Sequence, residues 1–264
     1  MRITHDFHIH THLSLCANRT VCAEDYVENA KALGLTKLGF SDHFWDDAIP
    51  GAFPFYENQD YNHIAPLKDQ LAQIAQDQVK LFFGGEVEYD PVNRSIALTE
   101  AVAEQMDYII VPNSHTHFTM PRECYMPYQQ HVDFMIRAFD DIVACPVSKY
   151  VTAIAHPFQA VACPYPNQIL IDIISDNVFL RLFEKAAKAD IAFEINLEPM
   201  MRKSPGEIEA MSQIRMFRLA KHSGCKFIFG SDAHSKDAHQ WYFNADIVAG
   251  LLDLAEKDIV AIAR

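Results

Sequence analysis

The sequence predicts an α/β barrel, and three observations lead to that fold class. The chain has 264 residues, within the size range of a single α/β barrel domain. Short runs of apolar and β-branched residues alternate with segments of helical periodicity, which is typical of βα units and a parallel sheet. Seven such runs favour a closed or nearly closed barrel over an open sheet. We therefore expect one domain over residues 1–264.

The individual elements are predicted from periodicity and from the residues that end each run. The expected strands cover residues 3–9, 37–41, 79–89, 108–114, 151–156, 191–196 and 226–232. Residues 23–34 carry Tyr26, Val27, Ala30 and Leu33 at helical spacing, and Gly34 stands where such a helix ends.

Two irregular stretches, residues 46–63 and 117–130, are rich in proline and aromatic residues and follow strand ends. Loops at that edge of a barrel usually form the wall of the active site. Their aromatic side chains, and those just before them, either line a pocket for a ring-bearing substrate or pack the loops against the barrel. They are Phe44, Trp45, Phe53, Phe55, Phe118, Tyr125 and Tyr128.

Composition and charge exclude several classes of protein. The formal net charge is -13, so the chain lacks the basic balance that nucleic acids or anionic membranes attract. No run of about 18 apolar residues and no apolar signal core occur, and a cytoplasmic location is the default expectation. The six cysteines have no CxxC spacing and are expected to be mostly reduced. The sequence leaves the oligomeric state open.

Nearly every expected strand ends in histidine, aspartate or glutamate. These strand-end residues and their near neighbours are His8, His10, Asp42, His43, Glu86, Glu88, His115, His117, His156, Glu194, Asn196, Asp232 and His234. In a barrel the strand ends converge on one face, where buried carboxylates would repel one another without cations. Two or three divalent metal ions remove that repulsion, and mixed imidazole and carboxylate ligands favour Zn, Mn or Fe over Mg or Ca.

The ordered motifs HxH, SDH, GxE, SH, AHP and GSDAH resemble those of the PHP (polymerase and histidinol phosphatase) family, from His8 to beyond His234. The resemblance implies a distorted (β/α)7 barrel with a metal site at the C-terminal ends of the strands. It also implies phosphoester hydrolysis, with Glu86 as a bridging carboxylate. The metal ligands that it implies are His8, His10, His43, Glu86, His115, His156, Asp232 and His234.

Two positions leave alternatives open. Family members with three metals often have a further histidine six residues beyond the second histidine of HxH, and this sequence has Cys16 there. Because thiolate is a good zinc ligand, Cys16 either completes a third metal site or is a small residue beside a two-metal site. In the SHTH motif we prefer His115 as ligand, because it lies nearer the strand end, and expect His117 to contact substrate.

The expected chemistry is attack on phosphorus by a hydroxide that bridges two metals, which lower the pKa of bound water to about 7. The chain has no motif for a protein nucleophile. We expect Asp42 and Asp232 to be catalytic, by orienting imidazoles or moving a proton; alternatively, Asp42 only fixes the tautomer of His43. Arg19 and Arg122 are expected to bind phosphate from loops, because guanidinium matches phosphate oxygens.

The sequence thus predicts a metal-dependent phosphoesterase acting on a small phosphorylated metabolite, histidinol phosphate or a similar monoester. The first alternative is an amidohydrolase or lactonase on the same barrel, which an absence of arginine and lysine near the metals would favour. A non-catalytic metal-binding module is a weaker alternative, because degenerate scaffolds usually lose ligands and this ligand set is nearly complete.

Overall fold

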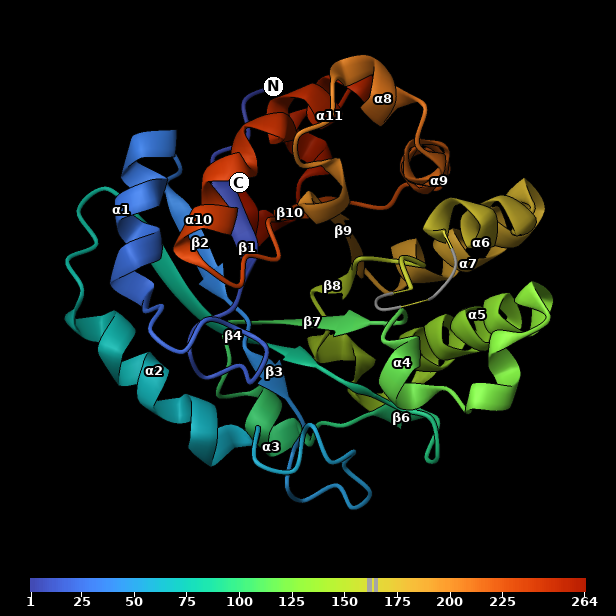
Figure 1. Ribbon diagram of the computed structural model, residues 1–264, viewed down its shortest axis with the longest axis horizontal. Helices are drawn as coiled ribbons and strands as arrows, with labels where there is room; N and C mark the ends of the chain where they lie inside the picture. Colours follow the sequence, from blue (N-terminus) through green and yellow to red (C-terminus); the bar gives the residue numbers. More distant parts are fainter. Residues whose placement is uncertain (161–162, 164–165) are drawn as a thin grey trace.

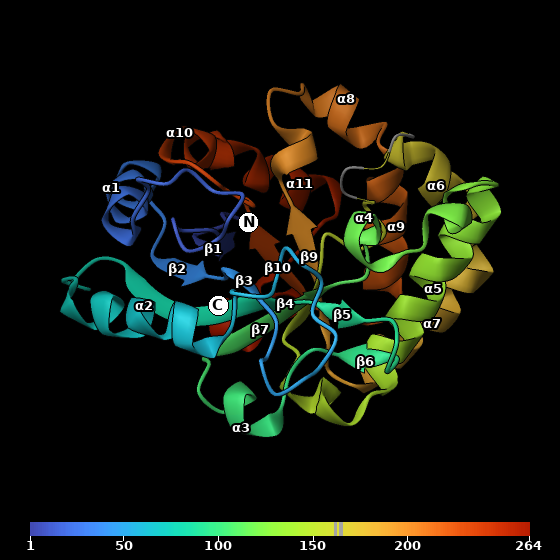
Figure 2. The ribbon, with the colours of Figure 1, turned by 60° about the horizontal axis from the view of Figure 1, so that its bottom comes forward.

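A parallel β-sheet that curls into a barrel forms the centre of the computed structural model, which describes residues 1–160, 163 and 166–264 (Figures 1 and 2). The seven expected strands are confirmed, and each pairs with the next one along the chain. They are β1 (His5–Ile9), β2 (Lys37–Phe40), β4 (Lys80–Val87), β7 (Tyr108–Pro112), β8 (Ala153–Ala155), β9 (Ala192–Asn196) and β10 (Phe227–Gly230). The short strand β3 (His43–Phe44) continues beside β4, and β5 (Tyr89–Asp90) forms a hairpin with β6 (Ser95–Ile96).

Helices surround the barrel, and the apolar core lies between them and the strands (Figure 2). Their bounds are α1 Ala23–Leu33, α2 Tyr61–Gln73, α3 Glu100–Ala103, α4 Thr116–Thr119, α5 Tyr128–Ala144, α6 Asn167–Ile173, α7 Asp176–Lys188, α8 Pro205–Glu209, α9 Ser212–His222, α10 Lys236–His239 and α11 Ala245–Leu251. The predicted helix over residues 23–34 is confirmed as α1. Gly34 ends it with a φ of 72°, a left-handed conformation that glycine adopts without strain.

The two stretches that we expected to be irregular differ in structure. Residues 46–60 form a loop, and α2 begins after Asp60, whose side chain accepts a hydrogen bond from the backbone N–H of His63 at 2.9 Å. Residues 117–130 are instead mostly helical, with α4, a 3-10 turn over Arg122–Tyr125 and the start of α5. Pro121 and Pro127 immediately precede the last two of these elements, as expected for a residue that lacks a backbone N–H.

The barrel closes where β1 meets β10, and side chains complete the junction. The backbone N–H groups of Asp232 and His10 donate to the carbonyls of His8 and Ala233 at 2.8 and 3.0 Å. Lower in the barrel, the Asp6 carboxylate accepts hydrogen bonds from the backbone N–H groups of Ser231 at 3.0 Å and His8 at 3.1 Å. Asp6 therefore links the two strands whose ends carry HxH and SDAH.

A buried contact between Asp6 and His239 supports this junction. The second oxygen of Asp6 lies 3.2 Å from Nε2 of His239, on α10, and both side chains are fully buried. The α10 helix follows directly after the segment that contains Asp232 and His234. The contact between Asp6 and His239 therefore links α10, and with it the segment after β10, to strand β1.

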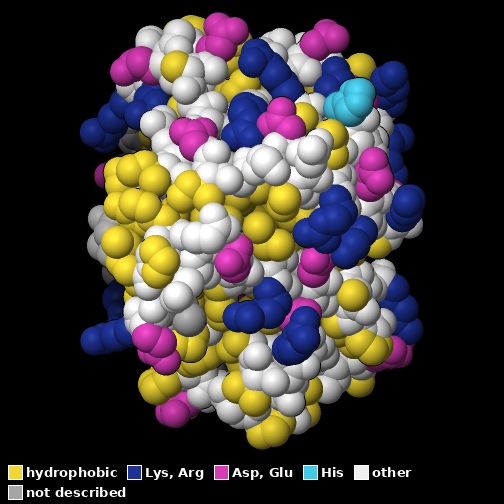
Figure 3. Space-filling model, turned by 90° about the vertical axis from the view of Figure 1, so that its right-hand side faces the viewer, with side chains coloured by type: hydrophobic (Ala, Val, Ile, Leu, Met, Phe, Trp, Pro, Cys, Tyr) yellow, Lys and Arg dark blue, Asp and Glu magenta, His cyan; other side chains and the backbone are white. Residues whose placement is uncertain are grey.

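The surface on the side of α5, α6 and α7 carries hydrophobic side chains among charges of both signs, with hardly any histidine (Figure 3). Ile169 and Ile173, one turn apart on α6, are among the exposed hydrophobic residues. Among the described residues, the helices are all too short or too polar to cross a membrane.

We predict that Asp6→Ala destabilises the metal-free protein by about 2–4 kcal/mol, because it leaves two buried backbone N–H groups without an acceptor. Asp6→Asn is the matched control: it retains an oxygen for both N–H groups and should cost less. Urea denaturation in the presence of a chelator measures the free energy of unfolding of both variants. Equal stability of the alanine and asparagine variants would contradict this role of Asp6.

Candidate metal centre and its cavities

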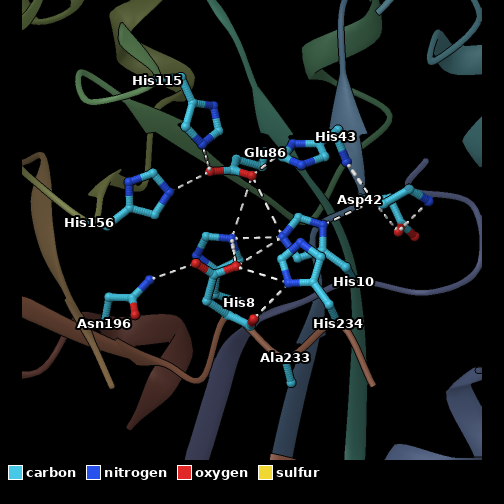
Figure 4. Close-up of polar contacts among 12 residues, drawn as sticks. His8, His10, Asp42, His43, Glu86, His115, His156, Asn196, Ala233 and His234 are labelled. Carbon is cyan, nitrogen blue, oxygen red and sulfur yellow. Dashed lines mark hydrogen bonds and ion pairs between the residues drawn. The ribbon is translucent and has the colours of Figure 1, made fainter. Parts of the chain in front are cut away.

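Side chains from the strand ends converge on the carboxylate of Glu86 at the end of β4 (Figure 4). One oxygen, Oε1, lies 2.8 Å from Nε2 of His156 and 3.5 Å from Nε2 of His115. The other oxygen, Oε2, faces three imidazole nitrogens, those of His43 at 2.9 Å and of His8 and His10 at 3.6 Å each. A single buried carboxylate is therefore shared by two sets of imidazoles.

Asp232 and His234, which follow β10, complete the cluster. Oδ1 of Asp232 lies 3.5 Å from Nε2 of His8 and 3.4 Å from Nε2 of His10, and the His234 ring stacks on His10 with ring centroids 4.2 Å apart. Among the described residues, four groups have ligand atoms within 4.8 Å of one another. They are His8, Glu86 and His156; His43, Glu86 and His115; His8, His10 and Asp232; and His10, His43 and His234. The structure thus brings all eight expected ligands together.

The outer nitrogen of most of these imidazoles is held by a hydrogen-bonding partner. Two of these Nδ1 atoms contact carboxylates: that of His8 lies 2.7 Å from Glu194, and that of His115 lies 2.9 Å from Glu88. Two contact serine hydroxyls: that of His10 lies 2.9 Å from Ser14, and that of His156 lies 2.6 Å from Ser114. The Nδ1 of His234 lies 2.8 Å from the backbone carbonyl of Asp232. Metal-bound histidines in proteins almost always have such a partner, which fixes the tautomer and ring orientation.

Glu88 and Glu194, which the sequence placed at strand ends without a role, are two of these partners. The second oxygen of Glu194 accepts a hydrogen bond from the backbone N–H of His156 at 2.5 Å. Glu88 accepts hydrogen bonds from the Tyr56 hydroxyl and, at 2.9 Å, from the backbone N–H of Tyr89. Both carboxylates are thus fixed before any metal binds.

Three backbone positions near the cluster have conformations or contacts that few residues tolerate. His156 and Asp232 adopt positive φ angles of 25° and 54°, in the left-handed region that non-glycine residues rarely enter and that clusters at functional sites. A Cβ at Gly230 would lie only 2.5 Å from that of His8 and would also overlap Glu194. Glycine at the end of β10 therefore allows Glu194 to reach His8.

Asp42, expected to be catalytic, is buried beneath the loop that follows β1. Its two oxygens accept hydrogen bonds from the backbone N–H of Thr11 at 2.8 Å, the Thr11 hydroxyl at 2.7 Å and the Ser14 hydroxyl at 2.7 Å. The Ser14 hydroxyl in turn lies 2.9 Å from Nδ1 of His10 and accepts a hydrogen bond from the backbone N–H of His43 at 3.1 Å, so Asp42 is connected to the cluster through Ser14. Ser14 was not expected from the sequence.

Electrostatics show that the residues of the cluster fit metal ions. Burial alone would raise the pKa of Glu86, but His115, His8 and His43 outweigh it and hold that pKa well below its usual range. Burial would likewise lower the pKa of His8, yet the surrounding carboxylates raise it. Glu86 Oε2 and His43 Nδ1 are buried and, although 2.9 Å apart, make no hydrogen bond of acceptable geometry. Buried polar atoms of this kind are explained by a bound cation.

Two cavities open beside the cluster. The first, of about 160 Å³, is lined by Cys16, His43, Phe55, Glu86, His115, His117, Phe118, Asp232 and His234. The second, of about 400 Å³, is lined among the described residues by Gln159, Ala160, Cys163, Asn167, Glu198, Asp232 and His234. His117 therefore lies where the sequence expected a substrate contact. Burial lowers its pKa to about 4, so this imidazole is neutral.

The two arginines that the sequence predicted to bind phosphate lie outside the described lining of both cavities. Arg19 and Arg122 are exposed, and neither is among the described residues that line the two cavities. Lysine and arginine are absent from the described lining of both cavities. Positive charge at the reaction centre would therefore come from bound metals.

Cys16, an exposed residue, lines the first cavity together with His43 and His234. Partial burial raises the pKa of its thiol, but hydrogen bonding to His234 and His43 exceeds that effect and lowers the pKa to about 6. A thiolate next to two imidazoles is a ligand set that zinc accepts.

A parallel barrel with a His, Glu and Asp cluster at its strand ends defines a metal-dependent hydrolase. The family model described as "PHP domain" matches residues 6–198, and the chain belongs to the PHP family. Asp232 and His234 lie beyond the matched region. A search of curated proteins gives no match.

Solved structures are similar in fold. Histidinol phosphate phosphatase from Lactococcus lactis subsp. lactis Il1403, complexed with zinc, L-histidinol and phosphate, is 15% identical, with 97% of this chain and 98% of that chain covered and a TM-score of 0.66. The hisK protein of Listeria monocytogenes is 13% identical, with 89% and 96% covered and a TM-score of 0.59.

We predict that metal binding releases protons and strengthens as the pH rises from about 6 to about 9. An imidazole binds metal only when neutral, and His234 has a pKa of about 9, because its contacts with Cys16 and Asp232 outweigh its burial. Below that pH the metal must displace a proton. Calorimetric titration of metal-free protein in two buffers of different protonation enthalpy measures the release. A pH-independent affinity would contradict the prediction, and His234→Ala should release fewer protons.

Proposed function

We propose that this protein is a metal-dependent phosphoesterase that hydrolyses a small phosphomonoester, histidinol phosphate or a similar metabolite. The observation that carries the proposal is the position of Glu86 between two sets of imidazoles, because a carboxylate shared in this way suits two adjacent divalent cations. Membership in the PHP family supports it. The Lactococcus lactis structure, which holds L-histidinol and phosphate, suggests the first substrate to test.

In this proposal the protein side chains hold and orient the reacting groups. Metals bound by the cluster would supply water with a lowered pKa and polarise the phosphoryl oxygens. Asp232 borders both cavities, accepts a hydrogen bond from Asn196 at 3.1 Å and stays ionised, so it serves as a metal ligand. His117 donates a hydrogen bond to substrate without adding charge. Asp42 is a positioning residue for His10.

We further propose that the cluster holds three metal ions. Glu86, Asp232 and the imidazoles of His8, His10, His115 and His156 hold two of them, and Cys16, His43 and His234 hold the third. Imidazole and thiolate ligands together favour zinc at that third position over manganese.

One observation favours a second candidate function, hydrolysis of an amide or lactone. The described residues that line both cavities include neither arginine nor lysine, the side chains that normally select a phosphate group. The same cluster polarises a carbonyl as well as a phosphoryl oxygen. The two candidates therefore differ in substrate and share the metal centre.

A substrate panel with elemental analysis separates the two functions. We expect zinc-loaded or manganese-loaded protein to release inorganic phosphate from histidinol phosphate or another small monoester, and to leave amides and lactones intact.

Glu86→Gln should lower the metal content and reduce kcat/KM at least 1,000-fold, a loss of about 4 kcal/mol of transition-state stabilisation, while the circular dichroism spectrum stays unchanged. Turnover of carbonyl substrates alone would establish the alternative, and activity that survives Glu86→Gln would refute the bridging role. Arg19→Ala and Arg122→Ala in the same panel test the predicted phosphate contacts.

The number of metals is tested with Cys16→Ala. We expect this variant to bind one zinc equivalent fewer than the unaltered protein, as measured by elemental analysis after dialysis. Cys22→Ala is the matched control, because Cys22 hydrogen-bonds to Asp25 at the start of α1, outside the described lining of both cavities. If Cys16→Ala binds as much zinc as the unaltered protein, Cys16 is not a metal ligand and lies beside a site that holds two metals.

A further inference from the structure

The first cavity has a polar floor and an aromatic wall. The floor is formed by the carboxylates and imidazoles of the cluster. The wall is a continuous arc of rings: His43 meets Phe55 edge-on at 5.5 Å, Phe55 stacks on Phe118 at 4.7 Å, and Phe118 contacts His117 at 3.9 Å between centroids. The two phenylalanines come from different segments, the loop over residues 46–60 and α4, and both are only half-buried.

Most of the other loop aromatics have a packing role. Phe44 and Trp45 are buried, and Phe53 packs edge-on against Trp45 with ring centroids 5.7 Å apart. Among the described aromatic residues of these two stretches, Phe55, His117 and Phe118 line the cavity above the cluster. Phe55 and Phe118 therefore do both: they pack against the cluster of Trp45 and Tyr56 and also line the cavity.

We propose that Phe55 and Phe118 form the subsite for the leaving group of the substrate and that they select a flat, uncharged ring on a short linker. This inference rests on the proposed phosphoesterase function, because it places the ester group on the polar floor and the ring of the alcohol against the wall. Stacked or edge-on rings gain energy beyond simple burial, so the wall favours an aromatic ring over a flexible alkyl chain.

The imidazole of His117 offers a hydrogen bond at the edge of the ring site, since its Nδ1 is buried without a partner in the described structure.

The test compares 2-phenylethyl phosphate with n-butyl phosphate in the metal-loaded protein. Both release a primary alcohol, so a difference in kcat/KM reports recognition of the ring rather than leaving-group reactivity. We expect the unaltered protein to prefer the phenylethyl ester at least tenfold. Phe55→Ala and Phe118→Ala should each reduce that preference to threefold or less, mainly through a higher KM for the phenylethyl ester.

Phe53→Ala is the matched control, because Phe53 lies on the same loop and packs against Trp45. It should lower thermal stability and leave the tenfold preference intact. Equal turnover of the two esters by the unaltered protein, or a uniform loss on both esters in Phe55→Ala and Phe118→Ala, would overturn the ring subsite while the phosphoesterase function stands.

A binding measurement keeps the two proposals distinguishable. The non-hydrolysable 2-phenylethylphosphonate and n-butylphosphonate are titrated calorimetrically into the metal-loaded protein. We expect the phenylethyl compound to bind at least tenfold more tightly, and Phe55→Ala to remove the difference. If neither ester is hydrolysed, the phosphoesterase function is refuted, and equal or absent phosphonate binding refutes the ring subsite.

Discussion

The candidate metal site depends on the burial of Glu86 among imidazoles. A buried carboxylate is costly unless it is paired, and here five nitrogens lie within 3.6 Å of its two oxygens. These nitrogens come from β1 and the residue that follows it, from β3, and from the segments after β7 and β8. Each contact forms only if these strands end at the same height, so the register of the strands determines whether the cluster assembles.

Hydrogen bonds outside the cluster determine which way each imidazole points. The outer nitrogens of His8 and His115 meet carboxylates, and those of His10 and His156 meet serine hydroxyls. The inner nitrogens therefore face one another across the centre with little freedom to turn away. That arrangement is unfavourable for a protein without metal, since neighbouring imidazoles compete for protons, and it becomes favourable when cations occupy the centre.

The sequence predicted the barrel, its strands and the convergence of the eight expected ligands, because strand periodicity and strand-end position are local properties. It did not predict the roles of Glu194, Ser14 and Ser114. Their function arises only from contacts between distant segments, such as the 186 residues that separate His8 from Glu194. Ser14, four residues after His10, and Ser114, directly before His115, gave a weak local signal. Residues 117–130 were wrongly expected to be irregular, because proline between aromatic residues marks helix starts there.

The closure of the barrel explains why metal ligands occur at both ends of the chain. At the junction of β1 and β10, Asp6 replaces part of the backbone ladder and accepts hydrogen bonds from both strands. Two ladder-like bonds remain at the top, and they involve the backbone of His8, His10 and Asp232 themselves. The geometry of the junction therefore sets the distance between HxH and Asp232. A change at Asp6 would reach the metal centre through backbone alone, although its side chain lies below the cluster.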